Sequence, residues 1–364
     1  MRYYLIAGES SGDKHATALI KELKQRDPKA EFRGMGGDLM RNEGVVLLEH
    51  IQNYSVMGFS TVINTLPRIL KLLKACKQDL QSFNPDHLIL IDFPGLNLKI
   101  AEFAFDQQIP VHYFILPKIW AWKASRMKKV MKFTTNRFSI LPFEKDYYQE
   151  NGGDAEYVGN PSWYEVMNQN ILSASEFMLK YDLNDQPIIA LLPGSREQEI
   201  KRMLPLMSEL VKHYKDHQFI IAKAPNLDQN IYQKYLHPEN VKMINDDYHE
   251  LLKYSKVGLI TSGTATLEAA LCNLPHIVCY KTDWLTYQLA KRFVNVKFIS
   301  LVNIILRKQV TKELIQGELN VNNMISELDL LLHDDNSQKE EFHNLSKELG
   351  TKNPFSSIAE KLNK

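Results

Sequence analysis

The chain has 364 residues, of which 44% are hydrophobic and 24% charged, and its formal net charge is +1. This is the composition of an ordinary globular protein, and the length favours two domains that each close a core of their own. Because the charges nearly balance, we expect no nucleic-acid partner. The three cysteines lack CxxC spacing, which excludes a zinc set or a disulfide framework and indicates a reducing compartment.

The opening segment and the hydropathy pattern predict a cytoplasmic protein. The apolar run in "MRYYLIAGESSGD" is too short for a signal peptide and ends in a glycine turn. No stretch of about 18 apolar residues occurs, so we expect no membrane span. A location on a membrane surface stays open.

Strand-like and helix-like segments alternate along both halves of the chain. The expected strands are residues 3–8, 87–92, 111–116, 187–194, 218–224, 256–261 and 276–281. The expected helices between them are residues 13–25, 96–107, 197–214 and 265–272. Short apolar strands alternating with helices are typical of parallel sheets covered on both faces.

A polar stretch at residues 166–177 separates the two runs. We therefore predict an α/β fold with two Rossmann-like domains, residues 1–168 and 169–340, and a cleft between them. Residues 341–364 are helical in pattern. Asn353 is the expected N-cap of the last helix and Pro354 its first residue, and we expect this segment to pack back on an N-terminal domain.

The first candidate for chemistry is Asp92, which ends the apolar run 88–91 and precedes Phe93, Pro94 and Gly95. Ligands of open parallel sheets bind beyond the carboxyl ends of the strands. From the residues alone two interpretations stay open. Asp92 caps the next helix, or its carboxylate faces a ligand and takes a proton.

A second loop, "GESSGD" at residues 8–13, follows the first strand. Its glycines permit a tight turn, and Ser10, Ser11 and Asp13 can cap the next helix, whose first amides attract anions. The loop is neither GxGxxG nor a P-loop, so it supports neither a dinucleotide nor ATP. A plain capped turn is the competing interpretation.

Two loops of the second half favour a nucleotide. Gly194, Ser195 and Arg196 end one strand, and an arginine at a helix start can grip phosphate oxygens in pairs, although it can also be a plain surface residue. In "SGT" at residues 262–264, small residues again open a helix, and Glu268 lies one turn in, where it can reach a ribose diol. Together the loops predict that the second domain binds the nucleotide.

A metal site is not expected. Asp246 and Asp247 are adjacent carboxylates, but "DYHE" at residues 247–250 has the spacing of a capping box, and HExxH and DxD motifs are absent. We therefore predict no metal and no cofactor.

Residues 62–80 form a basic amphipathic helix interrupted by Pro67. Such a helix either docks on its own core or contacts anionic lipid. In the second case the membrane-contact residues are Leu66, Ile69, Leu70 and Leu73.

Taken together, six motifs make the chain resemble the bacterial lipid-A-disaccharide synthases over nearly its whole length. They are "IAGESSGD" (6–13), "LIDFPGLN" (90–97), "IWAWK" (119–123), "ILPFEK" (140–145), "LLPGSR" (191–196) and "TSGTATLEA" (261–269). The resemblance implies an inverting, metal-independent glycosyltransferase of the GT-B architecture. The implied donor is UDP-2,3-diacylglucosamine, and the acceptor is 2,3-diacylglucosamine 1-phosphate (lipid X). It also implies a homodimer with exchanged C-terminal segments, peripheral on the cytoplasmic face of the inner membrane.

The resemblance assigns roles by position. Asp92 becomes the catalytic base, and Glu9, Ser11 and Asp13 become acceptor-site residues. The implied donor-site residues are Gly194, Ser195, Arg196, Ser262, Gly263, Thr264, Glu268, Asn303, Glu313 and Gln316. The chain departs from the family pattern at Leu116, Asn160, Tyr164 and Val302, which bears on fine contacts and acyl-chain preference.

Two other functions share some of these features. A nucleotide-sugar 2-epimerase has the same architecture and uses carboxylates, but it has no role for the basic helix or for "IWAWK". A non-catalytic lipid- or nucleotide-binding protein keeps the pockets but tolerates the loss of Asp92.

Overall fold

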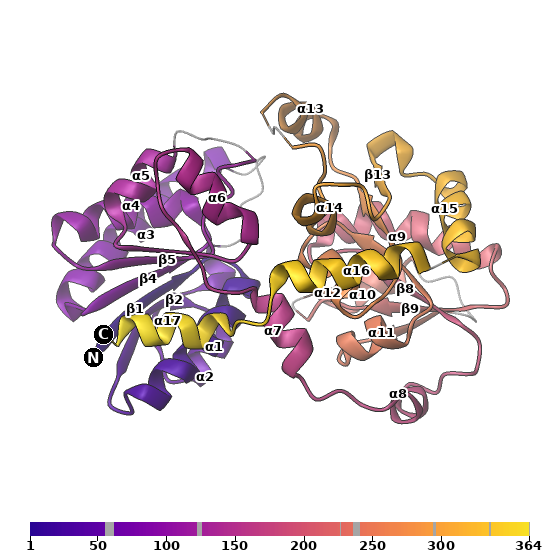
Figure 1. Cartoon of the computed structure of the whole chain (residues 1–364), viewed down its shortest axis with the longest axis horizontal. Helices are drawn as coiled ribbons and strands as arrows, with labels where there is room; N and C mark the ends of the chain where they lie inside the picture. The colour runs from indigo at the N-terminus through magenta and orange to yellow at the C-terminus, as the bar shows by residue number, and fades with distance from the viewer. Residues whose placement is uncertain are drawn as a thin grey trace. The chain divides into compact units, whose positions relative to one another are not determined.

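The computed structural model in Figure 1 describes residues 1–54, 62–121, 126–225, 227–235, 241–293, 296–334 and 336–363. The chain forms two compact units: unit 1 is Met1–Pro161 with Thr351–Lys364, and unit 2 is Ser162–Gly350. Each unit is built on one parallel sheet with helices packed against it. The predicted fold class of two parallel-sheet α/β domains is therefore confirmed, while the cleft between the domains stays a prediction.

Unit 1 contains a seven-stranded sheet in the order β3-β2-β1-β4-β5-β6-β7. Its strands are β1 (Arg2–Ala7), β2 (Glu31–Gly36), β3 (Val46–His50), β4 (His87–Ile91), β5 (Val111–Phe114), β6 (Asn136–Ser139) and β7 (Glu156–Tyr157). All the pairings are parallel. The strand order reverses at the neighbours β1 and β4, and at such a switch point the outgoing loops diverge and leave a ligand crevice.

Helices cover both faces of this sheet. They are α1 (Ser10–Arg26), α2 (Asp38–Asn42), the 3-10 turn η1 (Ile51–Asn53), α3 (Val62–Phe83), α4 (Pro94–Asp106), α5 (Arg126–Phe133), α6 (Pro142–Glu150) and α17 (Pro354–Leu362). Because side chains alternate along a strand, Tyr4 and Leu90 join the core beneath α3 and α4, whereas Tyr3 and Phe114 face α17.

The C-terminal helix α17 lies along α1, the yellow and indigo helices of Figure 1. The Asn353 side chain accepts hydrogen bonds from the amides of Phe355 (2.9 Å) and Ser356 (3.1 Å), so the predicted N-cap is confirmed. The Phe355 ring lies against the rings of His15 and Phe114. Exchange of this segment between subunits stays a prediction.

Unit 2 contains a six-stranded sheet in the order β10-β9-β8-β11-β12-β13. Its strands are β8 (Ile188–Leu192), β9 (Gln218–Ala222), β10 (Val241–Ile244), β11 (Val257–Thr261), β12 (His276–Tyr280) and β13 (Glu313–Ile315). All the pairings are again parallel. The switch point here is the pair β8 and β11.

The helices of unit 2 also pack on both faces of its sheet. They are α7 (Pro161–Asn168), α8 (Ala174–Lys180), α9 (Glu197–Glu209), α10 (Asn230–Gln233), α11 (Tyr248–Tyr254), α12 (Thr264–Leu271), α13 (Trp284–Phe293), α14 (Leu301–Leu306), α15 (Val321–His333) and α16 (Asn336–Leu349), with 3-10 turns η3 (Leu210–Lys212) and η4 (Gln316–Glu318). Met203 of α9 and Leu328 of α15 belong to one core cluster, and Leu251 of α11 and Ala269 of α12 to the other.

The capping box predicted at residues 247–250 is wrong. Asp247 is the N-cap of α11, but its side chain makes no capping bond and accepts instead from Lys180 and Tyr181. The Glu250 carboxylate accepts from the Leu172 amide at 2.9 Å. Both carboxylates therefore tie α11 to the segment around α8, a tertiary role that local spacing does not reveal.

The basic helix α3 spans Val62–Phe83 and contains Pro67. Leu73 packs against the core of unit 1, Ile69 is half-buried and the Leu70 side chain is 51% exposed. The side chain of Leu66 lies outside the described residues. None of the described helices is long and apolar enough to cross a membrane.

Candidate active site

The switch points of the two sheets gather most of the predicted site residues. In unit 1, β1 and β4 pair with Ala7 opposite Ile91, so the loop carrying Glu9 and the loop carrying Asp92 leave the sheet side by side. In unit 2, β8 and β11 pair in the same way, with Leu192 opposite Ile260. The loops 194–196 and 262–264 therefore start next to each other.

The backbone around Asp92 is strained. Asp92 and Phe93 have φ values of 47° and 49°, and Ile115, at the end of the neighbouring strand β5, has φ 63°. Left-handed backbone at residues other than glycine costs roughly 1–3 kcal/mol each and is rarest for β-branched residues such as isoleucine. Strain of this kind clusters at active sites, which makes this edge of unit 1 the leading candidate.

Buried polar groups hold Asp92 in this conformation. Its carbonyl accepts hydrogen bonds from the Tyr113 hydroxyl and the Asn97 side-chain amide, both at 2.7 Å, and its amide donates to the Phe114 carbonyl at 3.1 Å. Tyr113 and Asn97 are fully buried. Since these bonds use only the main chain of Asp92, they orient its carboxylate without consuming it. Neither residue was predicted from the sequence, although a polar Asn97 in an otherwise apolar helix start is a signal for a buried hydrogen-bonding role.

Asp92 does not cap a helix, so that alternative is wrong. The N-cap of α4 is Phe93, and the helix begins at Pro94. The Phe93 ring lies over Gly8, where an added Cβ would be only 2.1 Å from the ring. Gly8 is therefore required for the close approach of the two loops at the switch point.

The surroundings of Asp92 suit a general base. Burial, together with the nearby Glu9 carboxylate, raises the pKa of Asp92 from 3.8 to about 6, while Lys118, the Phe93 amide and His15 act in the opposite direction. A base works best when its pKa lies near the working pH. At neutral pH most of the Asp92 carboxyl is ionised and able to accept a proton.

The first loop divides into exposed and buried residues. Glu9 and Ser11 are exposed, with Glu9 as the N-cap of α1, and no side chain caps that helix. Asp13 is only 5% exposed, and its carboxylate accepts from the amides of Gly37 (2.7 Å), Leu39 (3.2 Å) and Met40 (3.3 Å). The predicted cap of α1 is therefore wrong, because Asp13 caps the start of α2.

In unit 2, the Glu199 carboxylate accepts hydrogen bonds from the backbone amides of the "GSR" loop. Glu199 Oε2 accepts from the backbone of Ser195 (2.9 Å) and Arg196 (3.2 Å). Gly194 has φ 122°, and a Cβ there would lie 2.5 Å from Glu199. The Arg196 side chain is 68% exposed, with its guanidinium 3.9 Å from Glu199. Glu199 was not predicted from the sequence, although a glutamate three residues after an N-cap is a capping-box signal.

The second loop of unit 2 presents a helix start. Gly263 is the N-cap of α12, and the first amides of a helix have no partner within it. The Ser262 hydroxyl donates to the Ile299 carbonyl at 3.2 Å, and Thr264 at the first position is exposed. The amides at 263–264 can therefore receive an anion such as a phosphate.

Glu268 lies one turn into α12 and is mostly buried. Its side chain is 15% exposed, with its oxygens 3.4 Å from the Ser162 hydroxyl and 3.7 Å from His249 Nε2. The Tyr248 hydroxyl also interacts with it. The carboxylate is thus held in place by neighbours within unit 2.

Asn303 and Glu313 brace the loop that Ser262 contacts. Asn303 is fully buried, and its amide nitrogen donates to the Thr311 carbonyl and to Glu313, both at 2.8 Å. The Glu313 carboxylate also accepts from the amides of Ile299 and Ser300. The two residues therefore support the loop at 299–300.

Gln316 has a comparable supporting role after β12. Its side chain accepts from the Thr282 amide at 2.8 Å and donates to the Thr282 carbonyl at 3.1 Å. Any effect of Gln316 on a ligand thus passes through the loop that contains Thr282.

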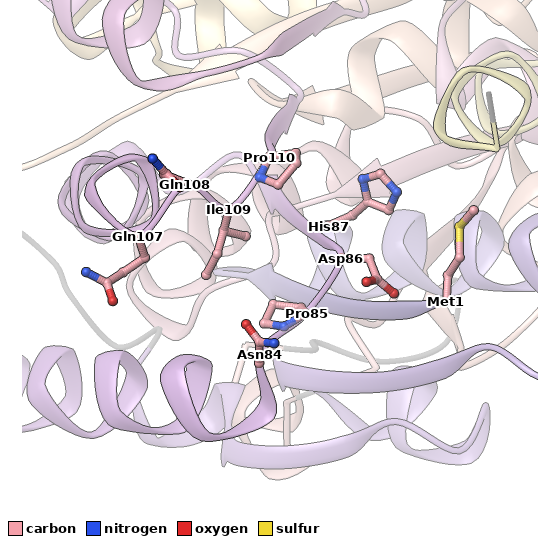
Figure 2. Close-up of a pocket in the computed structure, with 9 residues that line it drawn as sticks. All are labelled: Met1, Asn84, Pro85, Asp86, His87, Gln107, Gln108, Ile109 and Pro110. Carbon is pink, nitrogen blue, oxygen red and sulfur yellow. The ribbon is translucent and has the colours of Figure 1, made fainter.

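A hollow on unit 1 lies at the opposite edge of its sheet. Figure 2 shows its lining by Met1, Asn84, Pro85, Asp86, His87, Gln107, Gln108, Ile109 and Pro110. These residues flank the amino ends of β4 and β5, so the hollow contains none of the predicted site residues.

The two parallel-sheet α/β units define a fold that the chain shares with solved two-domain proteins. The glycotransferase of kitacinnamycin matches with a TM-score of 0.69 at 12% identity, covering 100% of this chain and 98% of that one. The UDP-GlcNAc 2-epimerase from Neisseria meningitidis bound to UDP-GlcNAc matches with a TM-score of 0.60 at 15% identity, covering 100% and 98%. At such identities the likeness shows the fold alone.

Sequence comparison narrows the class to one family. The family model described as lipid-A-disaccharide synthetase matches residues 3–361. The lipid-A-disaccharide synthase of Myxococcus xanthus is 35% identical over 334 residues, covering 90% of this chain and 87% of the relative. That of Syntrophus aciditrophicus is 34% identical over 357 residues, covering 95% and 93%.

The chain belongs to the lipid-A-disaccharide synthetase family. It is a glycosyltransferase of lipid A disaccharide synthesis, which confirms the resemblance found in its motifs. The alternatives of an epimerase or a non-catalytic binding protein are not favoured.

Proposed function

We propose that the chain transfers 2,3-diacylglucosamine from UDP-2,3-diacylglucosamine to the 6-hydroxyl of lipid X, giving a β-1,6-linked disaccharide 1-phosphate and UDP. The acceptor binds at the switch point of unit 1, and the UDP group at that of unit 2. The observation that carries the proposal is Asp92, a carboxyl whose pKa is raised to about 6 and whose strained backbone lies where ligands of this fold bind.

Asp92 acts as the general base in this proposal. As the acceptor 6-hydroxyl attacks the anomeric carbon of the donor, its proton passes to the Asp92 carboxylate and the bond from that carbon to the UDP oxygen breaks. Attack from the side opposite UDP inverts the anomeric centre. Base catalysis of this kind contributes roughly 10²–10⁴ in rate. Glu9, whose charge acts on Asp92, and the exposed Ser11 of the same loop hold acceptor hydroxyls, and Asp13 acts through the loop at the start of α2.

The donor residues stabilise the leaving UDP. Arg196 and the amides at 263–264 bind the diphosphate, where negative charge grows as the glycosidic bond breaks. Glu268 accepts from the ribose hydroxyls. Asn303, Glu313 and Gln316 support the surrounding loops. This arrangement supplies cationic and amide donors from the protein itself, so the proposed mechanism uses no metal ion.

The proposal is tested by incubating the protein with both acylated substrates and following products by mass spectrometry. The expected products are UDP and the disaccharide 1-phosphate in equal amounts. Release of UDP without disaccharide would show donor hydrolysis, and an altered donor sugar would show epimerase chemistry. Binding of UDP without turnover would show a binding protein that does not catalyse the transfer. Each of these three outcomes contradicts the proposal.

We also propose that the chain acts as a homodimer bound peripherally to the cytoplasmic face of the inner membrane. The exposed Leu70, with the exposed Lys71 and Lys74 beside it on α3, supports contact with anionic lipid. Sedimentation equilibrium tests the dimer, and a monomer at micromolar concentration contradicts it.

The membrane contact is tested by Leu70→Ser. Loss of one leucine from a bilayer contact costs about 1.5–3 kcal/mol, so we expect roughly 10- to 100-fold weaker co-sedimentation with anionic liposomes. Leu330→Ser, at a leucine on α15 that is 62% exposed, is the matched control and should change nothing. If the two variants lose liposome binding equally, α3 has a purely structural role.

A further inference from the structure

The loop after β5 exposes a single lysine from an otherwise covered segment. In residues 116–121, Leu116, Pro117, Ile119 and Ala121 are buried and Trp120 is half-buried, whereas Lys118 is exposed. The loop starts beside Asp92, because β5 pairs with β4 and the Asp92 amide donates to the Phe114 carbonyl at 3.1 Å. Lys118 therefore lies at the edge of unit 1 where the acceptor is proposed to bind.

Several contacts fix this loop in place. The Trp120 indole N–H donates to the Glu144 carboxylate at 3.0 Å, and the Trp120 ring meets the Phe143 ring edge-on at 5.1 Å. The Tyr147 hydroxyl donates to the Ile119 carbonyl at 3.5 Å. Because α6 supplies Phe143, Glu144 and Tyr147, that helix anchors the loop at Ile119 and Trp120.

Glu144 is an unusual anchor. It is 1% exposed and also accepts from the Leu141 amide at 3.3 Å. Burial raises the pKa of Glu144 to about 7, while Trp120, the Leu141 amide and Lys118 act in the opposite direction. Burial and then the Glu144 charge raise the pKa of Tyr148, one turn further along α6. A buried carboxylate that accepts two N–H groups holds them in a defined geometry.

The Lys118 ammonium acts electrostatically on the carboxyls of Asp92 and Glu144 without forming an ion pair with either. It lowers the pKa of both Asp92 and Glu144. Across the part of the chain that the structure describes, it makes no hydrogen bond or ion pair. Two further described cations near this edge, Lys14 at the start of α1 and Arg126 at the start of α5, have interactions of their own.

We propose that Lys118 binds the phosphate monoester of the acceptor, and that Glu144 and Trp120 are positioning residues that hold its loop. This inference rests on the proposed function, which supplies an acceptor with a 1-phosphate. An ammonium offers three donors to a group that carries a charge of about −1.5 to −2 and three acceptor oxygens. Binding the phosphate here leaves the other end of the sugar for Asp92, so Lys118 selects phosphorylated acceptors.

The test compares two acceptors in one enzyme. We measure kcat/KM for lipid X and for 2,3-diacylglucosamine without the phosphate, in the wild type and in Lys118→Met. A charge-assisted contact contributes about 1.5–3 kcal/mol, so the preference for the phosphorylated acceptor should fall roughly 10- to 100-fold in Lys118→Met. Lys145→Met, at the exposed lysine next to Glu144, is the matched control and should keep the full preference.

Using the ratio of the two acceptors separates phosphate binding from other effects of Lys118. Removing the ammonium also raises the pKa of Asp92, but this affects both acceptors and cancels in the ratio. An unchanged preference in Lys118→Met overturns the proposal. Disaccharide formation by the wild type is scored separately, so failure of the proposed function is distinguishable from failure of this inference.

The positioning role has its own variants. Glu144→Gln keeps an oxygen for the Trp120 N–H, whereas Glu144→Leu does not. We expect Glu144→Leu to lose the phosphate preference and Glu144→Gln to keep most of it, with UDP affinity in both equal to that of the wild type. If the two variants show the same preference, Glu144 does not position the loop.

Discussion

The switch points of units 1 and 2 use their backbones in opposite ways. At the switch point of unit 1 the residues with left-handed backbone are Asp92, Phe93 and Ile115, whereas at that of unit 2 the residue with positive φ is Gly194. Glycine adopts such a conformation at little cost, but the other residues do not. Unit 1 therefore uses strain to aim a side chain, whereas the glycine of unit 2 lets the Glu199 carboxylate reach the amides of its own loop. This contrast fits the proposed acid–base site of unit 1 and the proposed anion site of unit 2.

The largest expected effect is on kcat and comes from replacing the Asp92 carboxylate. Asp92→Asn keeps the shape of the residue and its main-chain bonds to Tyr113 and Asn97, but it cannot accept the proton. We expect kcat to fall roughly 10²–10⁴-fold, with UDP affinity unchanged by calorimetry. Asp154→Asn, at a surface carboxyl that is 70% exposed, is the control. Near-normal turnover would mean that another group is the base.

The buried Glu144 carboxyl of unit 1 makes the free energy of unfolding depend on pH. Burial raises the pKa of Glu144 from 4.5 to about 7, so the folded state holds this proton more tightly than the unfolded state does. The resulting stabilisation is complete below the unfolded pKa and is lost as the pH rises through about 7. A shift of this size corresponds to about 3 kcal/mol. In chemical denaturation, the wild type should therefore lose stability relative to Glu144→Gln between pH 4 and pH 8. A constant difference between the two proteins contradicts the pKa assignment.

The anion site of unit 2 is tested by Arg196→Ala. The guanidinium is 68% exposed, so its removal leaves the core intact but deletes a charge-assisted contact worth about 1.5–3 kcal/mol. UDP should bind roughly 10- to 100-fold more weakly by calorimetry. Lys212→Ala, at a lysine of unit 2 that is 65% exposed, should bind UDP normally. If the two variants bind UDP equally, the proposed role of Arg196 is wrong.

The sequence predicted the framework of both sites better than their internal contacts. Apolar runs ending in glycine or polar residues gave the strands and the loops at their carboxyl ends, because those signals are local. The partners of the site residues are not local. Asp13 caps a helix that starts 25 residues later in the chain, at Asp38, and Trp120 meets Glu144 across 24 residues. Such pairs exist only once the sheet has brought their loops together.

The role of Asn303 shows the same limit. The family resemblance pointed to this residue, but only the structure shows that it is fully buried and bonded to Thr311 and Glu313. A polar side chain within an apolar run such as "LVNIIL" gives no sign of whether it contacts a ligand or a neighbouring loop. That distinction depends on burial, which is a property of the folded chain.

The smallest expected effect is on UDP affinity and comes from replacing Glu199. This residue places a carboxylate within the proposed anion site of unit 2, where unit 1 has its proposed base. Glu199 occupies the amides of Ser195 and Arg196, which a diphosphate would otherwise reach. Glu199→Gln removes the charge that competes with the phosphate while keeping an oxygen for the amides. We expect UDP to bind about 3- to 10-fold more tightly, the effect of about 1 kcal/mol of removed competition.

Calorimetry at two salt concentrations tests this account of Glu199, since screening should shrink the gain if charge competition is its cause. Glu209→Gln, at the far end of α9, is the matched control and should leave UDP affinity unchanged. Weaker binding by Glu199→Gln would instead show that the carboxylate shapes the loop for the donor. In that case the amides of Ser195 and Arg196 would serve the fold of unit 2, and the anion site would consist of Arg196 and the start of α12.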